Sequence, residues 1–264
     1  MTAAKVPKIT VLFWVIKVLT TGMGEAAADY LGTVSLVLAG AAGTLGIVAA
    51  LWLQFRTPRY VTAVYWFAVA MVAVFGTMAA DGLHVALGLP YAATTLFWAV
   101  VVGILFWRWH RSEGTLSIHS IVTTRRETFY WLTVLATFAL GTAAGDLTAA
   151  SLHLGYLVSG LLFAAVIAVP ALGWWRFRLD ATVAFWCAYV VTRPLGASFA
   201  DWLAKPRSGE SSGAAHGLGY GDGTVTAVLT LVIAVLVAYL AVARTDVQSR
   251  AGHGGAPLVR DARG

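Results

Sequence analysis

Residues 13–29 of the chain read FWVIKVLTTGMGEAAAD, and the same framework occurs four times at unchanged spacing. The other copies read YWFAVAMVAVFGTMAAD at residues 65–81, YWLTVLATFALGTAAGD at residues 130–146 and FWCAYVVTRPLGASFAD at residues 185–201. Each copy has an aromatic residue, a tryptophan, nine variable residues, a glycine, three variable residues, a small residue and an aspartate. Agreement at so many fixed positions indicates an internal repeat, which has to be recognised before the fold is assigned.

Each motif is followed by a plainer apolar stretch, so the repeated unit consists of two apolar segments. Charged residues make up 11% of the chain, whereas soluble domains average about 25%. About 20 apolar residues cross the hydrocarbon core of a bilayer. Eight segments meet this length, near residues 9–30, 33–55, 60–82, 92–109, 127–149, 155–175, 181–203 and 224–243. The sequence therefore predicts an all-α, polytopic transmembrane bundle of eight helices.

The repeats are expected to be parallel, because a unit with two crossings brings every copy in from the same side of the membrane. We expect the motif helices inside the bundle and the plainer helices around them. The first apolar segment carries the motif, so it belongs to the fold and is not read as a cleaved signal peptide. The prediction is one transmembrane domain over residues 1–250 followed by a polar C-terminal tail at 251–264, with repeats at about 8–57, 58–112, 125–179 and 180–246.

The net charge of +6 is explained by topology. Fourteen lysines and arginines fall in the N-terminus, the loops after even-numbered helices or the C-terminus, and only Lys205 and Arg207 fall in the other loops. Lys and Arg concentrate on the cytoplasmic side of membrane proteins. We expect a multi-pass protein of the inner (plasma) membrane with both termini cytoplasmic. Its basic residues would meet anionic lipid of the bilayer, so nucleic acid is not an expected partner.

The stretch KVLTTGMGEAAAD at residues 17–29 resembles the signature of bacterial membrane-anchored proteins built from a tandem repeat of unknown function. The resemblance covers about residues 8–245 and is fullest in the first repeat. Later copies keep the glycine and the aspartate but replace Glu25 with Thr77, Thr142 and Ala197. The resemblance implies a membrane fold and a compartment, and it implies no established activity.

The four motif aspartates are the candidate ligands of a cation. At about 100° per residue, the residue four before each aspartate lies on the same helix face and one turn deeper. Three of these deeper residues carry oxygen, so the predicted site consists of Asp29, Asp81, Asp146 and Asp201, extended inward by Glu25, Thr77 and Thr142. Hard oxygen ligands favour Mg²⁺, Ca²⁺ or Mn²⁺, with a proton or Na⁺ as alternatives. A structural interpretation stays open, in which the aspartates are solvated or cap helices and the tryptophans belong to the core or to an interfacial belt.

Two basic residues lie deep in apolar segments. An uncompensated charge at the bilayer centre costs about 2.5–3.5 kcal/mol even on a lenient insertion scale, so Lys17 and Arg193 should face the protein interior. Glu25 is the acidic residue at comparable depth, and we expect it to pair with Arg193, with Lys17 or with both. Such a pair could also be purely structural. Arg193 is followed by Pro194, which predicts an irregularity in the seventh helix.

These features favour a channel or transporter for a small cation. The alternatives are a non-transporting membrane protein, such as a sensor or an assembly subunit, and an intramembrane enzyme. We do not expect an enzyme, because no recognisable nucleophile or metal-ligand motif occurs, the six histidines are scattered and Cys187 is the lone cysteine. No organic cofactor is expected, only a bound cation. Oligomer formation is left open by the sequence.

Overall fold

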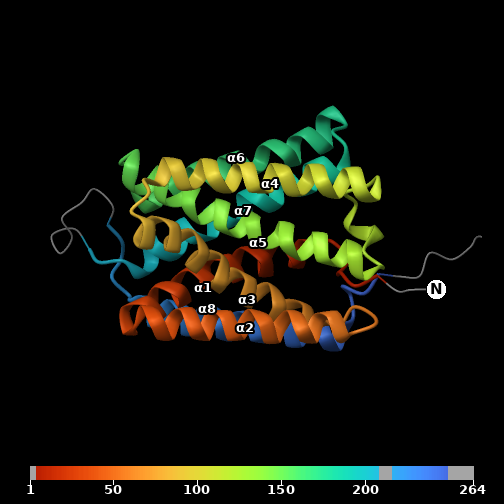
Figure 1. Ribbon diagram of the computed structural model, residues 1–264, viewed down its shortest axis with the longest axis horizontal. Helices are drawn as coiled ribbons and strands as arrows, with labels where there is room; N and C mark the ends of the chain where they lie inside the picture. The colour runs from red at the N-terminus through yellow and green to blue at the C-terminus, as the bar shows by residue number, and fades with distance from the viewer. Residues whose placement is uncertain (1–3, 208–215, 249–264) are drawn as a thin grey trace, which may run out of the picture.

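The computed structural model describes residues 4–207 and 216–248, so the polar tail expected at residues 251–264 lies outside the described residues. The described residues contain eight long α-helices and no strand (Figure 1). The helices are α1 (Val11–Val34), α2 (Leu36–Arg56), α3 (Thr62–Asp81), α4 (Tyr91–Glu113), α5 (Thr124–Asp146), α6 (Gly155–Phe177), α7 (Ala181–Ala204) and α8 (Asp222–Ala243). Three short segments join them, the π-helical η1 (Gly82–Ala86) and η3 (Leu147–Ser151) and the 3-10 helix η2 (Ile118–Ser120).

Seven of the described helices are long and apolar enough to cross a membrane. They are α1, α2, α3 continued into η1, α4, α5 continued into η3, α6 and α8. The eighth, α7, contains Arg193 and packs between α1, α5 and α6. The protein is therefore a multi-pass helical membrane protein, and the prediction of an all-α repeat bundle is confirmed.

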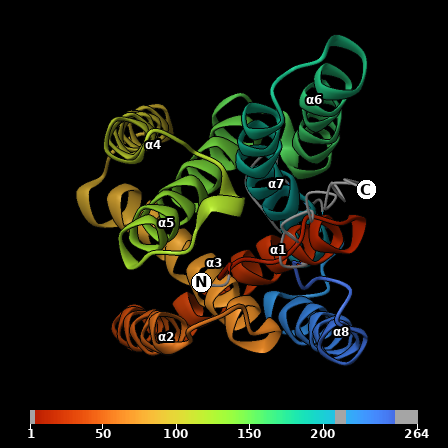
Figure 2. The ribbon, with the colours of Figure 1, turned by 90° about the vertical axis from the view of Figure 1, so that its right-hand side faces the viewer.

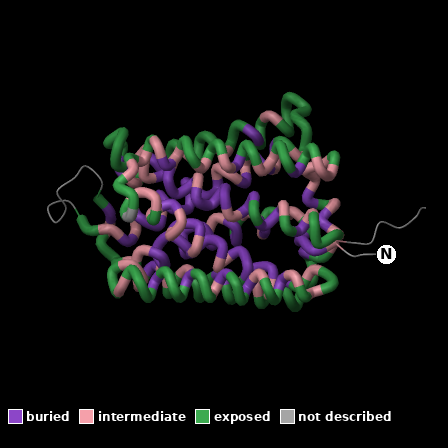
Figure 3. Tube along the Cα trace, viewed as in Figure 1, coloured by how far each residue is buried: buried purple, intermediate pink, exposed green. Residues whose placement is uncertain are grey.

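The four motif helices form a closed inner ring. Helix α1 packs on α3, α3 on α5, α5 on α7, and α7 returns to α1. More than half of the apolar window of α1, α3 and α5 is buried, compared with less than a quarter for α2, α4, α6 and α8. Figure 3 shows the buried trace in the middle of the bundle and the exposed trace on its outside.

The outer helices are displaced by one repeat. Helix α2 packs mainly on α3, α4 on α5 and α6 on α7, while α8 closes the circle by packing on α1 (Figure 2). Each plain helix therefore covers the motif helix of the next repeat. The sequence predicted the inner and outer layers, but not this displacement.

The motif glycines allow the inner helices to approach closely, as small residues do between membrane helices. A Cβ atom added to any of the four would collide with the next motif helix around the ring. The residue met always stands three positions before that helix's own glycine. The pairs are Gly24 with Ala73, Gly76 with Phe138, Gly141 with Arg193, and Gly196 with Thr21.

The motif aromatic residues form a second cyclic layer, nearer the end that carries the N-terminal segment. The first aromatic residue of each copy packs on the tryptophan of the next copy. Ring centroids are 5.6 Å apart for Phe13–Trp66, 5.6 Å for Tyr65–Trp131, 6.1 Å for Tyr130–Trp186 and 5.6 Å for Phe185–Trp14. Three of the tryptophans are buried and Trp14 is half-buried. The tryptophans thus belong to the core, as the structural interpretation expected.

The N-terminal segment packs against the same end of the bundle. The backbone N–H of Lys5 donates to the carbonyl of Ile121 at 3.1 Å, and Tyr60 N–H donates to the carbonyl of Ala4 at 3.1 Å. The Lys5 ammonium pairs with the buried carboxylate of Glu127 at 2.6 Å. Val6 of the same segment belongs to the hydrophobic cluster that contains Phe13 and Trp66, so the segment packs against the aromatic layer.

Candidate functional site

Arg193 lies in the middle of α7, and its side chain is completely buried. The helix continues through Pro194 without interruption. One guanidinium nitrogen, Nη2, donates to Glu25 Oε2 at 2.5 Å and to Thr142 Oγ1 at 2.7 Å, and it also contacts the Thr77 hydroxyl. The other, Nη1, donates to the backbone carbonyl of Thr21 at 2.8 Å. We call Arg193, Glu25, Thr77, Thr142 and Thr21 the arginine network.

The repeat explains why the arginine network forms. Glu25, Thr77 and Thr142 occupy the same motif position, so the ring of motif helices brings them to one level. The two threonine hydroxyls also reach the glutamate, at 3.2 Å from Thr77 Oγ1 and 3.5 Å from Thr142 Oγ1 to Glu25 Oε2. A hydroxyl can donate one hydrogen bond and accept others. The threonines therefore solvate both members of a buried ion pair.

Lys17 does not join the arginine network. Its side chain is buried, and its ammonium has no hydrogen-bond partner in the described part of the chain. The Nζ atom lies 3.9 Å from the ring centroid of Phe138 and 4.2 Å from that of Tyr189. Such cation–π contacts offer a cation about 0.5–2 kcal/mol. Arg193 and Lys17 were the two expected partners of Glu25, and Glu25 pairs with Arg193 and not with Lys17.

A second group of charges lies about one turn beyond Glu25 on α1 and about two turns beyond Arg193 on α7. One carboxylate oxygen from each of Glu25, Asp29 and Asp201 falls within 4.8 Å of the other two, a spacing that could hold a metal ion. Asp201 is 5% exposed, and its Oδ1 atom is buried without a hydrogen bond in the described chain. A buried polar atom left unsatisfied costs about 1–3 kcal/mol, and more when it is charged. We call Glu25, Asp29 and Asp201 the carboxylate cluster.

The carboxylate cluster holds a lysine that the sequence reasoning did not assign to it. Lys205 caps the end of α7, and its Nζ lies 2.5 Å from Asp29 Oδ2 and 3.9 Å from Asp201 Oδ1. Asp222, at the start of α8, is 3.1 Å away. Burial alone would lower the pKa of Lys205, but the three carboxylates raise it above its ordinary value. Two signals in the sequence pointed here, the spacing of four residues from Asp201 and the scarcity of basic residues in these loops.

A family model matches the chain four times, at residues 12–60, 64–115, 129–180 and 184–246, and its description is Repeat of Unknown Function (DUF347). The chain belongs to the DUF347 family. No curated protein and no solved structure matches it. Each DUF347 match covers a motif helix and the plain helix that follows it in the sequence. In the fold, that plain helix packs mainly on the motif helix of the next repeat.

The remaining motif aspartates of this DUF347 protein are not among the described carboxylates whose oxygens lie within 4.8 Å of one another. Asp81 and Asp146 are half-buried at the ends of α3 and α5, where η1 and η3 begin. Neither makes a hydrogen bond or an ion pair with another described residue. The structure thus brings Glu25, Asp29 and Asp201 within metal-binding distance, and it places Thr77 and Thr142 in the arginine network.

Glu25 belongs to both groups. Its Oε2 atom receives the guanidinium of Arg193, and the same carboxylate contributes to the carboxylate cluster. The DUF347 fold therefore places a buried ion pair next to an anionic site that has a buried oxygen without a hydrogen bond, and Glu25 belongs to both. Chemically, this arrangement can accept a hard cation and can couple its binding to the position of Arg193.

Proposed function

We propose that this protein binds a small cation at Glu25, Asp29 and Asp201 and carries it across the membrane. The observation that carries the proposal is the buried Oδ1 atom of Asp201, which lacks a hydrogen bond and belongs to a group of three carboxylates within 4.8 Å. Asp201 lies in the last turn of α7, where the helix dipole already supplies about half a negative charge. A bound cation would stabilise this concentration of negative charge.

The position of Lys205 supports the proposal, because its ammonium group shows that the carboxylate cluster already attracts one positive charge. Its ammonium is 2.5 Å from Asp29 and 3.9 Å from Asp201. A metal ion and the ammonium would repel each other at such distances. We therefore infer that an incoming cation displaces Lys205, which keeps Asp222 as an alternative partner at 3.1 Å.

The shared glutamate favours a transporter over an open pore. A cation that engages Glu25 competes with Arg193 for the same carboxylate, so its arrival weakens the arginine network on the inner side of the site. The arginine network and the aromatic layer together fill the centre of the motif-helix ring. Passage therefore requires these contacts to rearrange, which is the behaviour of a gated carrier.

The chemistry of the ligands limits the class of cation. Carboxylate and hydroxyl oxygens suit Mg²⁺, Ca²⁺ or Mn²⁺, and a site with two or three carboxylates can also take Na⁺ or a proton. Lysine and arginine concentrate in the N-terminus, the loops after even-numbered helices and the C-terminus. This bias favours a protein of the inner membrane with both termini in the cytoplasm. The carboxylate cluster would then face the outside and act as the entry site.

Flux into liposomes tests the proposal directly. Purified protein is reconstituted, and the uptake of Mn²⁺, Mg²⁺, Ca²⁺, Na⁺ and protons is followed with ion-specific dyes. We expect saturable uptake of at least one of these ions, and we expect Asp201→Asn to abolish it. Asp180→Asn is the matched control, because Asp180 caps the opposite end of α7 through Thr182 and Val183. Absence of uptake in the parent, or equal uptake by Asp201→Asn, would refute the proposal and favour a non-transporting role.

A further inference from the structure

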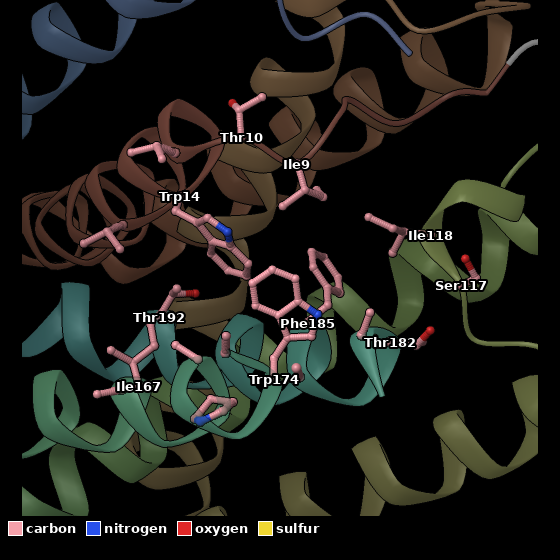
Figure 4. A pocket seen from close by; sticks show the side chains of 18 of the residues that line it. Ile9, Thr10, Trp14, Ser117, Ile118, Ile167, Trp174, Thr182, Phe185 and Thr192 are labelled. Carbon is pink, nitrogen blue, oxygen red and sulfur yellow. The ribbon is translucent and has the colours of Figure 1, made fainter. Parts of the chain in front are cut away.

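A cavity of about 870 Å³ lies between α1, α6, α7 and the segment around η2 (Figure 4). Its size falls in the range of about 300–1,000 Å³ that small-ligand sites occupy. Its wall is mainly apolar and includes Ile9, Trp14, Ile118, Ile167, Trp174 and Phe185. It is separate from the carboxylate cluster, since its α1 residues end at Val18.

The cavity opens to the side of the bundle. Val11 is 82% exposed and Trp174 is 57% exposed, and both line it. Ala168 and Ala171, also in the lining, are exposed on α6. These residues belong to helices that are apolar and long enough to span a membrane. The opening therefore faces lipid, and the cavity is accessible from the hydrocarbon core.

The polarity of the cavity is uneven. Figure 4 shows Ser117 and Thr182 on one side, with Ile167 and Thr192 on the opposite side. The Thr192 hydroxyl is already used, because it donates to the backbone carbonyl of Tyr189 at 2.6 Å. His119 also belongs to the lining, next to Ser117. A molecule with a long apolar part and a polar end fits this arrangement better than a uniformly apolar molecule does.

The surroundings of the polar end are basic. Lys8 is exposed and immediately precedes Ile9, which lines the cavity, and Arg176 and Arg178 are exposed shortly after Trp174. Two acidic residues lie in this neighbourhood, and both carboxylates already accept hydrogen bonds. Asp180 accepts from the backbone of α7, and Asp246, whose carbonyl accepts from the Lys8 N–H at 2.7 Å, accepts from the hydroxyls of Tyr60 and Thr62. The excess of positive charge suits an anionic headgroup.

The cavity also interrupts the repeat symmetry. The motif tryptophans Trp66, Trp131 and Trp186 are 2%, 3% and 5% exposed, whereas Trp14 is half-buried and borders the cavity. Three copies of the repeat therefore bury this ring against protein. In the first copy, part of the same ring is left for another occupant.

We propose that the cavity binds one anionic phospholipid, with an acyl chain inside and the headgroup at the end near Ser117 and Lys8. The acyl chain completes the packing of Trp14 and Trp174. The headgroup phosphate meets the basic side chains at the membrane surface. The ligand comes from the bilayer itself, which explains a lateral opening.

Native mass spectrometry of the full chain, exchanged into detergent with phosphatidylglycerol or phosphatidylcholine, tests this proposal. We expect one phosphatidylglycerol to stay bound per chain, and Ala171→Phe to remove it by filling the cavity. Ala164→Phe is the matched control, since Ala164 is exposed on the same helix and does not line the cavity. Lys8→Gln should reduce the preference for phosphatidylglycerol over phosphatidylcholine.

A second measurement does not depend on retention through purification. Phosphatidylglycerol with brominated acyl chains should quench tryptophan fluorescence less in Trp14→Phe than in the parent. Equal lipid retention by Ala171→Phe and Ala164→Phe would overturn the proposal. So would cross-linking of two chains through cysteines introduced at Ala168, because a second copy would then occupy the opening.

Discussion

The arginine network and the carboxylate cluster share Glu25, yet they differ in how fully their charges are satisfied. The side chains of Arg193 and Glu25 are 1% and 4% exposed, and two threonine hydroxyls contact both charges. In the carboxylate cluster, Asp29 and Lys205 are each 23% exposed, while Asp201 has a buried oxygen without a hydrogen bond. The arginine network pairs its carboxylate with a guanidinium and leaves Arg193 Nε without a hydrogen bond, whereas in the carboxylate cluster Asp29 and Asp201 face one lysine.

This difference separates a structural role from a binding role. A buried ion pair stabilises a protein only when its remaining hydrogen-bonding groups are satisfied. The threonines meet most of that requirement around Arg193, whose two terminal nitrogens are hydrogen-bonded while Nε is not, so the arginine network should hold the motif helices together. The carboxylate cluster should instead respond to added cation. Each of the following experiments asks whether these two groups behave differently.

Removing Arg193 should have the largest effect on stability. Arg193→Ala leaves the Glu25 carboxylate buried without its cation, and the free energy of unfolding should fall by about 3–5 kcal/mol. The measurement is thermal or denaturant unfolding in detergent micelles without added metal. Glu25→Ala should also destabilise, and the double variant should recover part of the combined loss. Strictly additive losses would show that the two side chains are not coupled.

Asp201→Asn should show the opposite pattern. It removes a poorly satisfied charge, so the stability without cation should change little. In the parent, a cation at 100 times its dissociation constant should raise the free energy of unfolding by about 2.7 kcal/mol, and this gain should disappear in the variant. Asp81→Asn provides the comparison outside the carboxylate cluster and should keep most of the gain. Equal losses in both variants would extend the site to the other motif helices.

Gly141→Ala tests how tightly the arginine network is packed. An added Cβ would collide with the Arg193 side chain and lie 2.8 Å from Pro194 Cδ. Overpacking of this kind costs about 1–3 kcal/mol. Gly103→Ala is the matched control, because a Cβ there meets nothing within 4 Å and alanine favours the helix. Unfolding curves of equal midpoint for the two variants would mean that the helices separate easily at Arg193.

The sequence was sufficient to predict the repeat, the inner and outer layers and a buried ion pair between Glu25 and a basic residue of an apolar segment. Repeat spacing fixes which residues share a level, and an isolated charge in an apolar helix must find its partner inside the bundle. The choice between Arg193 and Lys17 could not be made, because it depends on side-chain reach and on the rings of Phe138 and Tyr189 that receive Lys17.

Other features depend on contacts between repeats, which single-helix periodicity does not encode. The displacement that places α8 on α1 follows from how the ring closes, and the sequence of one repeat carries no sign of it. The sequence placed Lys205 only in a loop. In the structure its ammonium donates to the carboxylate of Asp29, which is 176 residues away in the chain. The sequence also does not show that Asp29 and Asp201, and not Asp81 and Asp146, lie within 4.8 Å of the Glu25 carboxylate.

Lys205→Gln should produce the smallest change, but one that distinguishes competition from simple ion pairing. The pKa of Lys205 is raised by its carboxylate partners, so its contribution to stability is complete below the unfolded value of about 10.4 and is lost only as pH rises through the higher folded value. The cation-free variant should therefore be less stable than the parent at pH 9, and this difference should disappear only at higher pH. Cation affinity should change in the other direction, because the competing ammonium is gone.

A tenfold tighter dissociation constant corresponds to about 1.4 kcal/mol, and we expect a gain of this order in a titration followed by the unfolding midpoint. Arg207→Gln is the control for charge alone, because Arg207 lies in the same loop and donates to the carbonyl of Leu218. If Arg207→Gln tightens binding as much as Lys205→Gln does, the effect is long-range electrostatics. If only Lys205→Gln does, the ammonium occupies part of the cation site. Weaker binding in Lys205→Gln would instead make the lysine a structural support of the carboxylate cluster, which would then resemble the arginine network.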